Sequence, residues 1–176
     1  MSRPCPPEPA LLVFGVLLGA PVGPGEILDA LEAEFGPAAL STPLRPFGYT
    51  PYYEREMGPG IRRAFLVMEG RHDPGDLAAL KLRSNRLEER WAREGRRRVN
   101  LDPGTLGLGQ LVLATGKPAA HRVYLAHGIY AEVEYVFERG SFRPLPWTYP
   151  DYREPAVIGF FNGARERLRR LRKETG

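Results

Sequence analysis

The chain has 176 residues, of which 43% are hydrophobic and 26% are charged, a balance that is ordinary for a soluble globular protein with a sizeable core. Its formal net charge of +4 permits an anionic partner without requiring one. The single cysteine, Cys5, excludes an internal disulfide bond and suits a reducing compartment.

The N-terminal region imitates an export signal, because Arg3 precedes an apolar run, but the surrounding residues argue against export. The apolar run Ala10–Ala20 is too short to span a membrane, and Pro21 would block cleavage after Ala20. We therefore expect a cytoplasmic protein, with a loose proline-rich tail at residues 1–9 and a single α+β domain at residues 10–176. Asn and Gln are scarce and Pro is plentiful, which would suit a thermophile.

The first part of the chain alternates between strand and helix patterns. Leu11–Leu18 is a continuous apolar run, which predicts a strand that is buried on both faces. Pro24 begins an amphipathic helix that ends before Gly36. Residues 39–50 contain two prolines, which cannot donate to a strand ladder, so this segment is at most an edge strand. Apolar alternation predicts a further strand at Arg62–Glu69.

A second helix is predicted to begin at Asp73-Pro74, where Asp73 is a good N-cap. Its core-facing stripe comprises Leu77, Leu80, Ser84, Leu87 and Trp91. Val99–Asp102 predicts a short strand. The resulting order, β-α-β-β-α-β, is that of a ferredoxin-like fold, in which the first and third strands are central.

The second part of the chain is predicted to extend or cover that sheet. Asp102-Pro103-Gly104 predicts a turn, and Thr105–Ala114 predicts a helix weakened by two glycines. Two β-hairpins should share a strand, with segments at 121–126, 129–138 and 141–145 and turns at His127-Gly128 and Arg139-Gly140. A final helix has an Arg-rich outer face and an apolar stripe of Val157, Phe160, Ala164, Leu168 and Leu171.

The first hairpin predicts a candidate catalytic group. A two-residue turn pairs Ala126 with Ile129, and Val123 and His121 then lie opposite Glu132 and Glu134. One face of the shared strand would carry Tyr130, Glu132 and Glu134, and the other would be a core face with Ile129, Ala131, Val133, Tyr135 and Phe137. Such a His–Glu group could perform acid–base chemistry, bind a divalent metal or form a cross-strand ion pair. The candidate catalytic residues are His121, Glu132 and Glu134.

Cations near this group predict an anion site. Lys117 and Arg122 lie close to His121 in the sequence and could hold a phosphate or carboxylate, or they could belong to a solvated strand edge. Gly116-Lys117-Pro118 resembles the end of a phosphate-binding P-loop. Pro118 stands where that motif needs Ser or Thr, and a strand rather than a helix follows, so we reject a P-loop nucleotide site.

Further polar residues could reach a ligand. Lys81, Asn85 and Glu88 share one flank of a helix, where a structural polar ladder is the simpler interpretation. Asn100 and Asp102 share a strand face, and Asp102 is either a turn-former or an acidic ligand. The aromatic loop with Trp147, Tyr149 and Asp151 could fold over the core as a lid or stack on a base or sugar.

Six sequence motifs carry a resemblance to a known family: YYEREMG (52–58), K-x-x-x-N-x-x-E (81–88), VNLDPG (99–104), LVLATGKPAAHRVYL (111–125), GIYAEVEY (128–135) and WTYPDYR (147–153). Together they resemble domain of unknown function 4416, a bacterial and archaeal family without an established activity, over almost the whole chain. Glu134 and Thr105 depart from the family pattern. The resemblance implies a functional site made from the residues in matched motifs, namely Glu56, Lys81, Asn85, Glu88, Asn100, Asp102, Lys117, His121, Arg122, Tyr130, Glu132, Trp147, Tyr149 and Asp151.

These patterns favour an enzyme or ligand-binding protein for a small anionic compound, phosphorylated or nucleotide-like. Lys117, Arg122 and Lys81 would hold the anion, His121 with Glu132 or Glu134 would supply acid–base chemistry or bind a divalent metal, and Trp147 or Tyr149 would close over the ligand. The alternative is an RNA- or ribosome-associated module that uses the Arg-rich helix and the aromatic loops. A protein-interaction domain is a third possibility.

Overall fold

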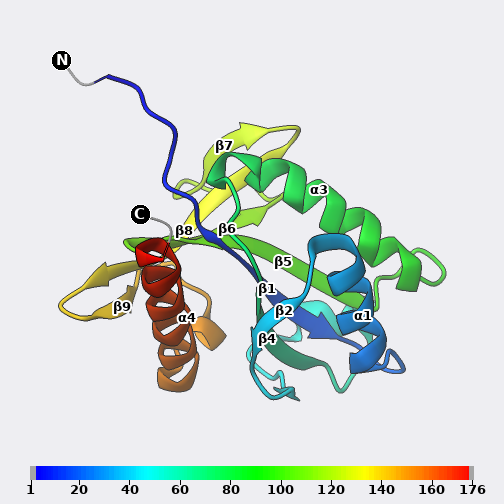
Figure 1. Cartoon of the computed structure of the whole chain (residues 1–176). Coiled ribbons are helices and arrows are strands. Elements are labelled where there is room, and N and C mark those ends of the chain that lie inside the picture. Colours follow the sequence, from blue (N-terminus) through cyan, green and yellow to red (C-terminus); the bar gives the residue numbers. More distant parts are fainter. Residues whose placement is uncertain (1–2, 175–176) are drawn as a thin grey trace.

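A large antiparallel sheet organises residues 3–174, the part of the chain described by this computed structural model (Figure 1). Its strands are β1 (Leu11–Leu18), β2 (Ala38–Ser41), β3 (Arg45–Pro46), β4 (Arg62–Met68), β5 (Val99–Leu106), β6 (Gln110–Thr115), β7 (Val123–Ala126), β8 (Ile129–Glu138) and β9 (Ser141–Pro144). The helices are α1 (Pro24–Phe35), α2 (Glu54–Met57), α3 (Leu77–Glu88) and α4 (Pro155–Lys173). The fold of the described residues is therefore α+β.

The strands follow the order β2-β4-β1-β5-β6-β8-β7, with β3 beside β4 and β9 beside β8. Thus the first and third strands of the predicted unit, β1 and β4, lie inside, between β2 and β5. The proline-bearing segment is at the sheet edge, as predicted, but it forms two short strands, β2 and β3, rather than one. At the opposite edge, β7 exposes three consecutive large apolar side chains, Val123, Tyr124 and Leu125.

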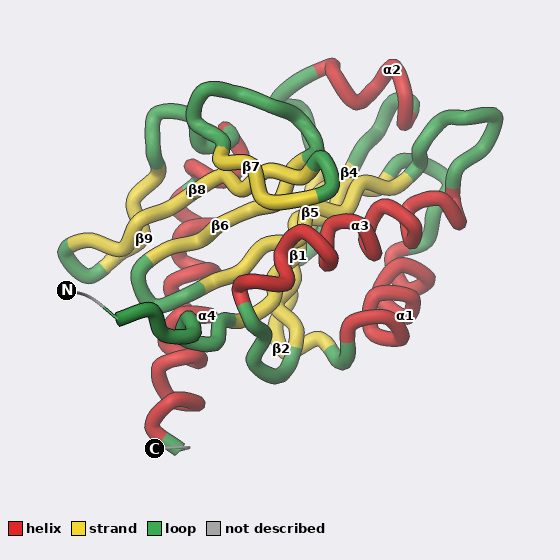
Figure 2. The backbone as a smooth tube through the Cα atoms, turned by 90° about the horizontal axis from the view of Figure 1, so that it is seen from above, coloured by secondary structure: helices red, strands yellow, loops and turns green. Residues whose placement is uncertain are grey.

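Helices cover both faces of the sheet, and the strand β1 is buried between them, as predicted. Phe14 and Val16 pack towards α1 and α3, whereas Leu11 and Val13 belong to the core on the α4 side. Figures 1 and 2 show α4 on the side of the sheet away from α1 and α3. The buried stripe of α4 contains Phe161 where the sequence predicted Phe160.

The predictions of a turn at 102–104 and a helix at 105–114 are wrong. Residues 102–104 continue β5, and a tight turn leads directly into β6, where the Gly107 amide donates to the Gln110 carbonyl at 2.9 Å. The two glycines that weakened the predicted helix serve this turn. Gly104 also has a packing role, because a Cβ there would lie only 2.6 Å from the Val112 carbonyl oxygen on β6.

Both predicted hairpin turns are confirmed, and in each of them both residues have positive φ, as a type I′ turn requires. The predicted register is wrong, however. Val123 lies opposite Ala131 instead of Glu132, because Leu125 is an extra residue in β7. A second irregularity at Glu134 shifts the pairing of β8 with β6.

Because of the irregularity at Glu134, the residues predicted to share one core face of β8 lie on different faces of the sheet. Ile129 packs with Leu77 and Ala78 of α3, whereas Tyr135 belongs to the core against α4. A bulge changes the face to which later side chains point, so strict alternation along β8 fails at this residue.

The predicted tail falls partly outside the described residues, because residues 1–2 are not among them. Residues 3–9 are exposed and form no helix or strand, although Arg172 of α4 donates to the Pro9 carbonyl and pairs with Glu8. Within residues 3–174, no helix combines the length and apolarity needed to cross a lipid bilayer.

Candidate functional site

The candidate site lies beside the first half of β5, where β5 and β6 are not paired. β5 pairs with β6 only over Gly104–Leu106, so its first half has no strand on that side. Two side chains of α3 take the place of the missing strand: the Leu101 amide donates to Glu88 Oε1 at 2.7 Å, and Lys81 Nζ donates to the Leu101 carbonyl at 2.7 Å. Pro103, two residues further along, points its nitrogen to the same open side, where no ladder bond is lost.

We call the side chains around this open side of β5 the strand-edge network: Glu56, Lys81, Glu88, Arg97, Asn100 and Asp102. Lys81 lies 3.9 Å from Glu88 and 3.5 Å from Asp102. Arg97 forms a bidentate pair with Glu56 and donates to Asn100 Oδ1, whose amide donates to Asp102 at 2.7 Å. Burial raises the pKa of Glu88, and the hydrogen bond from Arg97 lowers the pKa of Glu56.

A second group, the loop network, joins the loop after β6 to the aromatic loop before α4. It consists of His121, Arg122, Glu132, Glu134 and Tyr149. Buried Glu132 lies 2.8 Å from His121 Nε2 and accepts a hydrogen bond from Arg122 Nε at 2.9 Å. Arg122 donates its remaining bonds to the Lys117 carbonyl and the Tyr149 hydroxyl. Its guanidinium therefore fixes both loops against β8.

Glu134 does not contact His121, contrary to the predicted register. It lies at the irregularity of β8, where its Oε2 accepts from the Tyr149 amide at 3.2 Å and its buried Oε1 has no hydrogen-bond partner within residues 3–174. Burial, followed by the charge of Glu132, raises the pKa of Glu134 to about 8. This carboxyl group is therefore protonated at neutral pH.

Arg63 connects the strand-edge network to Asp151 of the aromatic loop, although the sequence analysis did not select it. Its side chain is only 9% exposed, its Nε lies 2.6 Å from Asp151, and its Nη1 lies 3.7 Å from Asp102. It packs over Gly15, where a Cβ would lie 2.6 Å from the Tyr152 hydroxyl and 3.1 Å from Arg63 Nη1. The signal in the sequence was an arginine on the apolar, alternating face of a strand.

Between these groups lies a cleft of about 320 Å³, which we call the tyrosine cleft. It is lined by Phe47, Tyr49, Thr50, Tyr52, Tyr53, Arg63, Asp102, Lys117, Arg122, Tyr149, Pro150 and Asp151. Burial raises the pKa of Tyr53 to about 12, so this phenol remains a hydrogen-bond donor. A hydrogen bond from Lys117 lowers the pKa of Tyr52.

Five of the predicted site residues line the tyrosine cleft: Asp102, Lys117, Arg122, Tyr149 and Asp151. Lys81, Glu88, Asn100, Glu132 and Glu134 are buried beside it.

The other predicted residues lie elsewhere. His121 stacks on Trp147 with ring centroids 5.2 Å apart, and neither lines the cleft. Tyr130 packs against Tyr124, and the side chain of half-buried Asn85 has no hydrogen bond or ion pair within the described chain.

The sequence analysis also missed Phe47 and Tyr49 as cleft residues. They lie in the segment whose two prolines interrupt a strand, so neither periodicity nor a motif marked them. As to metals, no group of three or more His, Cys, Asp or Glu side chains within residues 3–174 converges in a way that could hold an ion.

The sequence of residues 8–168 matches the protein family described as a domain of unknown function, DUF4416. Comparison with curated proteins and with solved structures gives no significant match. Because the matched region spans nearly the whole chain, including every residue of the strand-edge network, the loop network and the tyrosine cleft, this protein belongs to the DUF4416 family.

Proposed function

We propose that the protein binds a small anionic compound, phosphorylated or nucleotide-like, in the tyrosine cleft. One observation carries this proposal. Lys117 is a cation of the cleft that has no carboxylate within ion-pair distance in the described chain, whereas Arg63 and Arg122 are each paired with a buried acid. A cation without a counter-ion, held at a concave surface, is a site for an anion.

The position of Lys117 suits this role. Its ammonium group donates to the Tyr52 hydroxyl at 3.0 Å and lies 4.2 Å from the centre of the Tyr52 ring. The ring holds the cation without neutralising it, because a cation–π contact leaves the positive charge in place. An anion can therefore approach Lys117 without displacing a carboxylate.

The cleft walls suit a ring-bearing ligand. Phe47, Tyr49, Tyr52, Tyr53 and Tyr149 supply aromatic faces and edges on which a base or sugar can stack. The volume of about 320 Å³ lies at the lower end of the range of small-molecule sites, which favours a compact ligand.

The structure gives more support to ligand binding than to a catalytic role for the predicted pair of His121 and Glu132. Glu132 uses both carboxylate oxygens within the protein, and its side chain is only 1% exposed. His121 lies outside the cleft lining. A general acid or base must come within hydrogen-bond reach of the reacting atom, so a catalytic role for His121 requires the loop to move.

A thermal-shift screen against nucleotides, sugar phosphates and divalent cations tests the proposal. A ligand that binds only the native state raises the melting temperature, and at a given concentration a tighter ligand raises it further. For the best anion, Lys117→Ala should weaken binding about tenfold, the value of one charge-assisted hydrogen bond. Lys173→Ala, which removes the same charge from an exposed position on α4, is the control. Equal loss in both variants, or no stabilising anion at all, would contradict the proposal.

An RNA- or ribosome-associated module is the second candidate, and one surface favours it. Arg86 at the end of α3 and three arginines between α3 and β5, Arg90, Arg93 and Arg96, are exposed and form no side-chain ion pair in the described part of the chain. The arginines of α4 are less suitable, because Arg165, Arg167, Arg169 and Arg172 pair with acidic side chains. RNA binding that weakens steeply with salt and is reduced by Arg90→Ala with Arg93→Ala would support this candidate; salt-independent binding would exclude it.

We also propose that the first half of the chain is a ferredoxin-like unit in one cytoplasmic domain. The antiparallel order β2-β4-β1-β5, with α1 and α3 packed on one face, supports the topology. An experimentally determined structure of this protein or of a family member with another order of these four strands would contradict it.

A further inference from the structure

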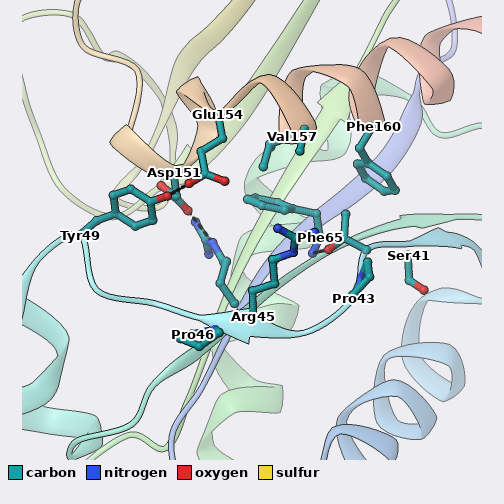
Figure 3. A pocket seen from close by; sticks show the side chains of 13 residues that line it. Ser41, Pro43, Arg45, Pro46, Tyr49, Phe65, Asp151, Glu154, Val157 and Phe160 are labelled. Carbon is teal, nitrogen blue, oxygen red and sulfur yellow. Dashed lines mark hydrogen bonds and ion pairs between the residues drawn. The ribbon is translucent and has the colours of Figure 1, made fainter.

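A second pocket, of about 670 Å³, lies between α4 and the edge of the sheet (Figure 3). It adjoins the tyrosine cleft, because the two share lining residues. Phe65 of β4 and Val157 and Phe160 of α4 form its apolar walls, and Pro43 and Pro46 line its lower side. Arg45 and Glu154 are the charged residues at its margin besides the paired Arg63 and Asp151. These charges cancel, so the pocket suits an uncharged apolar group.

The interrupted edge strand keeps this pocket open. β2 ends at Ser41, and β3 contains only Arg45 and Pro46 before the chain leaves the sheet. Because proline cannot donate to a ladder, the two prolines prevent the segment from forming one long strand. The first turn of α4 therefore faces a gap instead of a continuous strand.

The two cavities share one wall. Tyr49, Arg63 and Asp151 line both of them. Arg63 and Asp151 are buried and locked together, but Tyr49 is 43% exposed and lies in a loop. A hydrogen bond from its hydroxyl to Glu154 holds the ring in place (Figure 3). Tyr49 is therefore the one exposed side chain of the wall that the two cavities share.

We infer that the ligand of the tyrosine cleft is an anion that carries an apolar arm, and that the arm enters the second pocket past Tyr49. This inference rests on the proposed function and names the class of ligand: an organic phosphate with an alkyl or aryl group. Lys117 holds the charged end, and Phe65, Val157 and Phe160 enclose the arm.

Titration with methyl, butyl and hexyl phosphate tests the inference. Each methylene that enters the pocket should tighten binding by up to about fourfold, because burial of apolar surface scales with chain length. The series is followed by calorimetry on the full chain. The same three compounds are then measured against Lys117→Ala, which should weaken all of them by a similar factor.

A substitution that fills the second pocket separates its role from that of the cleft. Ala156 is exposed on the first turn of α4 and lines the pocket, so Ala156→Phe blocks the space with little effect on folding. We expect this variant to bind methyl phosphate unchanged and to lose the advantage of hexyl phosphate. Gly163→Phe, on the same helix at an exposed position outside the pocket, is the matched control and should retain that advantage.

The possible failures are distinguishable. Equal affinity for methyl and hexyl phosphate would overturn the inference and leave anion binding in the cleft intact. Hexyl phosphate binding that is insensitive to Lys117→Ala would place that compound in the second pocket alone and would also overturn the inference. No binding of any of the three compounds, combined with a negative nucleotide and sugar-phosphate screen, would overturn the proposed function together with it.

Discussion

The strand-edge network and the loop network both contain buried carboxylates, but these carboxylates have different structural roles. In the strand-edge network, Glu88 and Lys81 bond to the backbone of Leu101 at the place where a neighbouring strand is missing. In the loop network, Glu132 and Arg122 hold two loops against β8 and thereby shape the tyrosine cleft. The first network completes a sheet, and the second positions the walls of a cavity.

This difference shows how polar motifs should be read. Buried acids and bases of both networks are already bonded to each other or to backbone groups, so their presence in motifs does not by itself indicate chemistry. Lys117, supported by the loop network but paired with no carboxylate in the described chain, is the residue left for a ligand. The two networks should therefore differ in their effects on stability and on binding.

The largest expected effect is in the strand-edge network. Glu88→Ala leaves the buried Leu101 amide without an acceptor and removes a charge partner of Lys81 and Arg97. Breaking a buried pair in this way costs about 3–5 kcal/mol of unfolding free energy. Urea unfolding measures the loss.

Glu89→Ala is the matched control, because Glu89 is the next residue and is exposed. It should change stability by less than about 0.5 kcal/mol. A Glu88→Ala variant as stable as the control would show that water or another side chain satisfies the edge of β5, and the contrast between the two networks would disappear.

The loop network should give a pH-dependent effect through Glu134. Its pKa is raised to about 8 in the folded state, so folding keeps a proton on this carboxyl group that the unfolded chain releases near pH 4.5. The unfolded state binds fewer protons between these values, so stability falls as pH rises from about 4.5 to about 8. Each unit of pKa difference is worth about 1.4 kcal/mol and Glu134 is coupled to Glu132, so the loss is on the order of a few kcal/mol.

Glu134→Gln tests this directly, since glutamine imitates the protonated acid and keeps an oxygen for the Tyr149 amide. The variant should match the wild type near pH 4.5 and exceed its stability at pH 8. Parallel stability curves for the two proteins over this range would show that Glu134 titrates normally and that its burial has no energetic consequence.

A smaller effect is expected where Arg63 joins the strand-edge network to the aromatic loop. Gly15→Ala introduces a methyl group that would lie 2.6 Å from the Tyr152 hydroxyl and 3.1 Å from Arg63 Nη1. We expect a loss of about 1–3 kcal/mol from overpacking. Gly159→Ala in α4 has open space around its Cβ and should instead stabilise by about 0.5–1 kcal/mol. Thermal unfolding of both variants gives the comparison, and a stabilising Gly15→Ala would show that the Arg63 junction is loosely packed.

The sequence predicted most of the regular elements, the helix at 105–114 excepted, because their signals are local. The apolar run of β1, the N-terminal proline of α1 and the two-residue turns around β8 each need only a few neighbouring residues. The failures come from backbone features with no local signature. The bulge residues Leu125 and Glu134 moved the register, and Pro103, usually a strand terminator, lies within β5 because that strand has an open side.

The site was predicted in part for the same reason. Lys117, Arg122, Asp102 and Tyr149 lie in polar motifs and do line the cleft. Arg63 comes from a strand far away in the sequence, and its position depends on strand order and on the absence of a side chain at Gly15. Residues that meet only through the topology of the sheet cannot be grouped from spacing alone.

The smallest effect on stability should come from Lys117, the residue most important for binding. Lys117 is exposed, and within residues 3–174 its side chain bonds only to Tyr52, so Lys117→Ala should change unfolding free energy by less than about 0.5 kcal/mol. Its electrostatic effect is still measurable, because the hydrogen bond from Lys117 lowers the pKa of Tyr52. In the variant, the phenol of Tyr52 should titrate at higher pH, which NMR of ¹³C-labelled tyrosine detects, with Tyr124 as an exposed reference. A Lys117→Ala variant that unfolds as readily as Glu88→Ala would place Lys117 among the structural residues, and the distinction between a sheet-completing network and a ligand-holding cleft would no longer stand.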